Sequence, residues 1–134
     1  MLPHKHFVIS SFVIAITALF FQVGWIEGVY WVLIGGAVAM LLDIDAIIAA
    51  YTDKKLKGYG IVQVFRDYEG FLEKLKKTKI LNRLMFTHFV LAAAVSVVSF
   101  IFARRFFFPV VIGVIVHLFS DVYSLLKEDN SESF

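Results

Sequence analysis

The chain has 134 residues, of which 60% are hydrophobic, and its formal net charge is only +2. A soluble domain is usually about 45–50% apolar, so this excess, gathered in continuous runs, indicates an integral membrane protein with a single domain over 1–134. The small net charge argues against a nucleic-acid partner, and the absence of Cys excludes disulfides, thiolate metal sites and a cysteine nucleophile.

Four apolar runs predict an all-α bundle of about four transmembrane helices. The predicted spans cover about 7–23, 29–51, 84–102 and 106–126. The first run is short, because a span needs about 20 apolar residues. Lys5 before this run resembles the start of a signal peptide, but no clean small-residue cleavage site follows, so we predict that the run is retained as a membrane helix.

The segment 52–83, between the second and third spans, is the one long polar part of the chain. It carries nine of the 13 Lys and Arg residues. Basic loops stay on the cytoplasmic side, so we predict that this loop and both termini face the cytoplasm of a prokaryotic-type cell.

Apolar residues within this loop recur every three or four positions, which predicts an amphipathic helix. They are Ile61, Val64, Phe65, Tyr68, Phe71, Leu72 and Leu75. A basic amphipathic helix beside a membrane either lies in the headgroup layer against anionic lipids or packs on the bundle as a cap.

Six ionisable residues lie inside or directly beside the apolar runs. They are His6, Asp43, Asp45, His88, His117 and Asp121. Each such group costs roughly 2.5–3.5 kcal/mol to insert in a membrane, so these residues are usually kept for function. At a rise of 1.5 Å per residue, Asp43 lies roughly 21 Å and Asp121 roughly 22 Å from the outer ends of their spans. In an apolar core about 30 Å thick, the six therefore meet in the inner half or at its boundary.

The spacing of these residues constrains how they can share one centre. His117 and Asp121 are four residues apart, so they lie on one helical face, either as two ligands of one metal or as a His oriented by a carboxylate. Asp43 and Asp45 point roughly 200° apart unless the helix loosens there. If one is a direct ligand, the other binds a second metal, a His or a backbone donor.

Together these side chains make a sulfur-free set of nitrogen and oxygen ligands. Such a set suits Zn²⁺, with Mn²⁺ or Fe²⁺ as alternatives, and has room for one or two ions. A cation also neutralises clustered carboxylates, which repel each other in a low dielectric.

Two other classes of function use similar residues. Buried Asp and His relay protons in small transport or channel subunits, which at this size would work as homo-oligomers. Gly35 and Gly36 would allow close helix contact, either within one chain or between copies. A membrane scaffold that binds metal without turnover is the third possibility.

Four short motifs carry a resemblance to a known family. They are His6, Leu42-Asp43-Ile44-Asp45, Phe86-Thr87-His88-Phe89 and His117-Leu118-Phe119-Ser120-Asp121. Their order resembles that in the membrane-bound, metal-dependent hydrolases, also called LexA-binding, inner-membrane-associated hydrolases. Those proteins show an early His, then Pro-Asp-Ile-Asp, His-Arg-x-x-Thr-His-Ser and His-x-x-x-Asp. In this chain Leu42, Arg83 and Phe89 stand where the family has Pro, the first His of the third motif and Ser.

The resemblance implies a hydrolase whose metal is held by Asp43, His88, His117 and Asp121 and activates water toward a phosphoryl group. Asp45 or His6 would complete a second metal position or act as general base. A looser similarity to zinc-dependent phospholipases C implies phosphate-ester substrates. Because the site is expected near the cytoplasmic headgroups, the expected substrate is a phospholipid or lipid-linked phosphate held by Arg83 and the loop lysines.

Overall fold

The structure, a computed structural model, describes residues 3–56 and 61–131, which form helices joined by short turns, with no strand among them. The long helices are α1 (Pro3–Phe20), α2 (Trp25–Leu41), α6 (Ile80–Phe102) and α7 (Phe107–Ser131). The shorter ones are α3 (Ile44–Thr52), α4 (Ile61–Arg66) and α5 (Tyr68–Lys77), with 3₁₀ turns at Lys54–Leu56 and Arg104–Phe106. The all-α prediction is therefore confirmed for the described residues.

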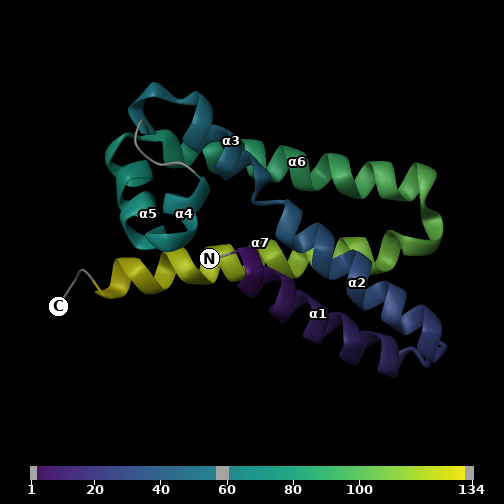
Figure 1. The fold of residues 1–134 in the computed structure, drawn as a ribbon. Helices are drawn as coiled ribbons and strands as arrows, with labels where there is room; N and C mark the ends of the chain where they lie inside the picture. The colour runs from purple at the N-terminus through teal and green to yellow at the C-terminus, as the bar shows by residue number, and fades with distance from the viewer. Residues whose placement is uncertain (1–2, 57–60, 132–134) are drawn as a thin grey trace.

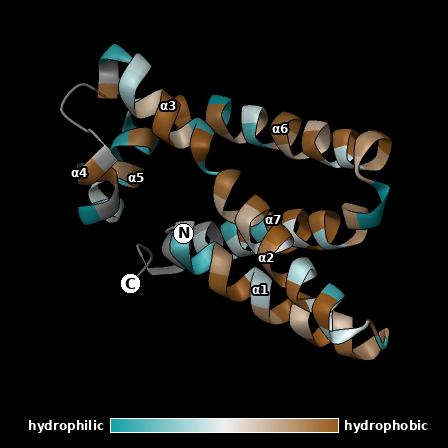
Figure 2. Cartoon of the chain, turned by 45° about the vertical axis from the view of Figure 1, so that its right-hand side comes forward, coloured by the Kyte–Doolittle hydropathy of each residue, from teal (hydrophilic) through white to brown (hydrophobic). Residues whose placement is uncertain are grey.

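Three apolar segments are long enough to cross a membrane. They are Trp25–Thr52 with 28 residues, Ile80–Phe102 with 23 and Arg104–Ser124 with 21. Helix α1 is apolar but falls below the length of these three. Figure 2 shows hydrophobic residues predominating along all four long helices. The outer surface of α1 is apolar as well, because Phe12, Leu19 and Phe20 are exposed.

The predicted second span, about 29–51, is interrupted at Leu42 and Asp43. Helix α2 ends at Leu41, and Asp43 occupies the N-cap position of α3 with φ −73° and ψ 1°. The Leu42 side chain is 1% exposed and packs with Ala92, Val110 and Val114. The chain thus changes direction here: α2 packs against α1 and α7, whereas α3 runs along α6 (Figure 1).

Helices α1, α2 and α7 approach one another at glycines. A Cβ atom built on Gly35 would lie 2.5 Å from the carbonyl oxygen of Pro109, and one built on Gly113 would collide with the backbone of Gly35. Gly36 faces Ser11 and the ring of Phe7 in α1. Gly35 and Gly36 therefore serve contacts within the chain, one of the two uses predicted for them. Such small residues let membrane helices gain van der Waals contact along their backbones.

The loop between α3 and α6 folds into a cap on these two helices. The apolar stripe predicted as one helix forms two, α4 and α5, because Asp67 starts a new helix by accepting a hydrogen bond from the Gly70 backbone N–H at 3.2 Å. The cap core consists of Ala49, Ala50, Leu56, Val64, Phe71, Leu72, Leu75 and Ile80. The apolar side of α5 is thus covered by the chain's own helices. The side chains of Ile61 and Phe65 lie outside the described part.

Candidate metal centre

Three histidines from three helices converge at one point of the bundle. His6 of α1 and His117 of α7 are fully buried, and His88 of α6 is 5% exposed. The ring centroids of His6 and His117 lie 4.0 Å apart, and those of His88 and His117 lie 4.8 Å apart. The Nε2 atoms of His88 and His117 approach to 2.6 Å. Three imidazoles therefore point the same ring nitrogen toward one small volume.

Two carboxylates complete this cluster. The Asp121 oxygens lie 3.1 Å, 3.3 Å and 3.6 Å from Nε2 of His6, His117 and His88. An Asp43 oxygen lies 3.8 Å from Nε2 of His6, and the other lies 3.8 Å from Nε2 of His117. Bonds of about 2.0–2.2 Å to one ion place its ligand atoms roughly 3–4 Å apart, the range of most of these pairs.

Among the described residues, three atoms of the cluster's side chains are buried without a hydrogen-bond partner: Nε2 of His6, Oδ2 of Asp43 and Nδ1 of His117. Buried polar atoms are seldom left in this state, and each exception calls for an explanation such as an ion. A nitrogen lone pair beside a carboxylate oxygen is a donor set that suits a divalent cation. The residues present therefore fit a metal ion chemically.

Asp45 lies next to this cluster and contacts His88. Both carboxylate oxygens of Asp45 lie 3.0 Å from Nδ1 of His88. A carboxylate accepts hydrogen bonds, so the His88 proton sits on Nδ1 and the Nε2 lone pair faces His117 and Asp121. Of the roles that the Asp43–Asp45 spacing left open for a second carboxylate, this geometry matches a partner for a histidine.

Arg83 does not join the cluster. Its Nη2 atom lies 3.3 Å from Oδ2 of Asp53, and its side chain is 69% exposed. It does line a groove of about 190 Å³ between α3 and α6, together with Asp45 and Thr87. Arg83 and Asp45, two of the three residues predicted to act in catalysis, thus share this groove, whereas His6 lies in the cluster.

Sequence reasoning missed Ser120. Its hydroxyl donates a hydrogen bond to the His117 carbonyl oxygen at 2.8 Å, and its Oγ atom lies 2.9 Å from Nδ1 of His6. The available signal was the spacing of Ser120, which comes three residues after His117. Residues three apart are neighbours on one face of a helix.

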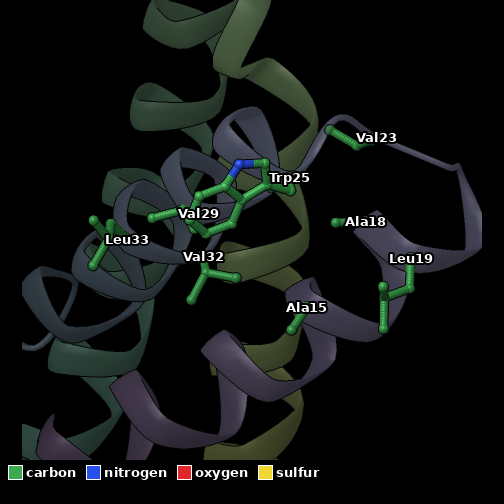
Figure 3. A pocket seen from close by; sticks show the side chains of 9 residues that line it. Ala15, Ala18, Leu19, Val23, Trp25, Val29, Val32 and Leu33 are labelled. Atoms are coloured by element: carbon green, nitrogen blue, oxygen red, sulfur yellow. The ribbon is translucent and has the colours of Figure 1, made fainter.

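A second, larger pocket lies between the C-terminal part of α1 and the N-terminal half of α2 (Figure 3). It has a volume of about 350 Å³ and is lined by apolar residues, including Ala18, Trp25 and Leu33. No acid, base or potential metal ligand lines it. The chemistry of the described residues is therefore concentrated at the His/Asp cluster.

Comparison with family models, curated proteins and solved structures gives no match for this chain.

Proposed function

We propose that this chain is a membrane-embedded, metal-dependent hydrolase of phosphate esters. The convergence of three histidine Nε2 atoms and two carboxylates, two of whose buried atoms lack a hydrogen-bond partner, carries the proposal. The family resemblance of the same residues supports it. Zn²⁺ suits this ligand set best, and the cluster offers enough donors for one or two ions.

In this proposal His6, Asp43, His88, His117 and Asp121 hold the ion. A bound divalent ion lowers the pKa of a water ligand and polarises a phosphoryl oxygen. Asp45 keeps His88 oriented through Nδ1. Its carboxylate also lines the groove between α3 and α6, so in this proposal Asp45 would be the general base that accepts the proton of the water that attacks the phosphate.

The substrate class is proposed from two cavities that both lie against α6. The polar groove carries Arg83, whose guanidinium can exchange Asp53 for a phosphate. A separate apolar pocket of about 260 Å³ lies between the α2–α3 break and α6, lined by residues such as Leu42, Ile44 and Leu91. A phosphate head in the first and a hydrocarbon chain in the second describe a lipid phosphate.

We also propose that α1 crosses the membrane and that the cap faces the cytoplasm. At 1.5 Å per residue the 18-residue α1 is roughly 27 Å long, close to the thickness of a thin bilayer. The basic character of 52–83 supports a cytoplasmic cap, because Lys and Arg are retained on that side.

The test of this function is hydrolysis that depends on a stoichiometric metal. Purified protein in lipid nanodiscs should contain at least one zinc ion per chain and release phosphate or headgroup from a phospholipid. Activity should vanish after chelation and return with zinc. Metal-free protein as isolated, with no gain on adding Zn²⁺, Mn²⁺ or Fe²⁺, would exclude the proposal, and bound metal without turnover of any phosphate ester would indicate a scaffold.

A proton-coupled transport subunit is the second candidate. The contacts from His117 through His88 to Asp45 form a continuous chain of groups that exchange protons. Proton flux into liposomes that contain the metal-free protein would favour this function over hydrolysis.

Arg83→Gln should raise the KM for a phospholipid substrate about 10-fold or more, because a hydrogen bond to a charged group contributes about 1.5–3 kcal/mol. The value of kcat should change less, since Arg83 lies outside the cluster. Arg83→Lys should restore part of the affinity because it restores the charge.

Arg105→Gln is a matched control for this variant. Arg105 is 67% exposed and lies 3.4 Å from Glu27, so its exposure and carboxylate partner resemble those of Arg83. It lies in the turn between α6 and α7, away from the groove. Equal KM values for the two glutamine variants would mean that Arg83 does not contact the substrate.

A further inference from the structure

Ser120 links the first and last long helices at the cluster. It belongs to α7, and its Oγ atom lies 2.9 Å from Nδ1 of His6 in α1. The same Oγ atom lies 2.8 Å from the carbonyl oxygen of His117, one turn earlier in α7. Both neighbours of this hydroxyl therefore belong to the proposed ligand set.

The number of protons available decides how these contacts are made. A serine hydroxyl has one proton to donate, and a carbonyl oxygen has none. Both hydrogen bonds can exist together only if Ser120 donates to the His117 carbonyl and accepts from His6. The proton of neutral His6 must then reside on Nδ1, which leaves a lone pair on Nε2.

That lone pair lies where a ligand is needed. Nε2 of His6 is fully buried, has no hydrogen-bond partner among the described residues, and lies 3.1 Å from Asp121 and 3.8 Å from Asp43. If the proton were on Nε2 instead, Nδ1 would face Ser120 as an acceptor, and the nitrogen in the cluster would be unable to bind a cation.

We propose that Ser120 is a positioning residue that fixes His6 in its Nδ1–H tautomer and thereby presents Nε2 as a metal ligand. Ser120 does for His6 what Asp45 does for His88, with a hydroxyl in place of a carboxylate. Such partners of a ligand's second nitrogen fix both its tautomer and its ring orientation. The NMR experiment below reads the tautomer in metal-free protein, so its outcome does not depend on the proposed function, and only the effect on metal affinity rests on that function.

The first experiment reads the tautomer directly in chelator-treated protein, by ¹⁵N NMR of histidine-labelled chains in micelles. His6 signals are assigned by their loss in His6→Gln. The unmodified protein should show His6 protonated on Nδ1, Ser120→Ala should shift His6 toward the Nε2–H form, and Ser120→Thr should retain the Nδ1–H form. An unmodified protein with His6 protonated on Nε2, or an unchanged tautomer in Ser120→Ala, would overturn the proposal.

Ser99→Ala is the matched control. Ser99 is buried in a long helix, whereas Ser120 is half-buried, and like Ser120 it donates to a carbonyl one turn earlier, that of Ser96 at 2.8 Å. Unlike Ser120, it makes no hydrogen bond to a histidine among the described residues, so its removal tests for a general effect of losing a helical hydroxyl.

The second experiment measures zinc affinity by competition with a chelating dye. Ser120→Ala should weaken binding about 10–100-fold, the usual effect of removing a ligand's hydrogen-bond partner, while Ser120→Thr and Ser99→Ala stay near the unmodified value. Equal affinities of Ser120→Ala and Ser99→Ala would refute the positioning role. If the unmodified protein binds no zinc, the metal centre is refuted, and the NMR result alone decides the role of Ser120.

Discussion

Asp121→Asn should lose zinc almost completely, with an affinity lowered by more than about 100-fold, beyond the usual effect of changing a ligand's partner. Asp121 is the acidic residue that reaches all three histidines, with oxygens 3.1–3.6 Å from their Nε2 atoms. Asparagine keeps the size of the side chain but removes the charge that balances a cation in a low dielectric. The measurement is zinc per chain in the purified variant, followed by dye competition.

Glu27→Gln is the control for this neutralisation. Glu27 pairs with Arg105 at 3.4 Å, away from the histidines, so the variant removes one carboxylate from the chain without touching the cluster. It should retain full zinc. If Asp121→Asn retained zinc as well as Glu27→Gln does, Asp121 would not be a ligand, and the metal centre would have to be rebuilt around Asp43.

Gly113→Ala should destabilise the bundle by about 1–3 kcal/mol, the usual cost of adding a methyl group to a tightly packed site. The new methyl group would meet the backbone of Gly35 rather than a movable side chain, so α2 and α7 must separate. The free energy of unfolding in mixed detergent micelles, from titration with SDS, measures this effect. Because α7 carries His117 and Asp121, zinc affinity should fall in the same variant.

Gly28→Ala tests whether the effect comes from the close contact or from losing any glycine. Gly28 lies in α2, the helix that Gly113 contacts through Gly35. A Cβ atom on Gly28 would meet only Ala18, at an ordinary distance of 3.8 Å. This variant should be neutral or slightly more stable, since alanine favours a helix by up to about 1 kcal/mol over glycine. Equal losses in the two variants would exclude the close contact as the cause.

The three long spans and the meeting of the ionisable residues could be predicted from sequence, because both follow from simple rules of length and rise. Depth along each helix placed Asp43, His117 and Asp121 at one level, and the structure brings them together. The predicted boundaries were less accurate: α6 starts at Ile80 rather than 84, and α1 ends at Phe20 rather than 23. Hydropathy marks the apolar stretch and not the helix: α6 extends beyond its stretch to include Asn82 and Arg83, whereas α1 ends before the last apolar residue of its stretch.

The sequence did not predict the break at Leu42 and Asp43 outright. It predicted only that the helix must loosen if Asp43 and Asp45 are to face one centre. The two-residue spacing of Asp43 and Asp45 required a loosened helix, but Leu42 is an ordinary helix-forming residue, so no local signal predicted where the helix ends. Its cause is tertiary: Leu42 is buried against α6 and α7, which holds the chain in this bend.

The partners of the histidines could not be predicted, because they depend on which nitrogen faces which neighbour. Periodicity assigns a residue to a face of a helix, but it does not orient an imidazole ring. The pairing of Asp45 with His88, and of Ser120 with His6, therefore emerged only from the packed side chains. The division of the loop stripe into α4 and α5 at Asp67 was missed for a simpler reason, since a capping Asp was read as part of one continuous helix.

The order of the helices in the chain has a consequence for biosynthesis. Translation proceeds from the N-terminus, so α1 and the Asp43 break are made long before α7. Until the ribosome has released α7, His6 and Asp43 lie in an incomplete bundle without His117, Ser120 or Asp121. The cluster can therefore form only after α7 has been made, and a chain truncated before His117 would leave His6 and Asp43 with only each other and His88 as partners in the cluster.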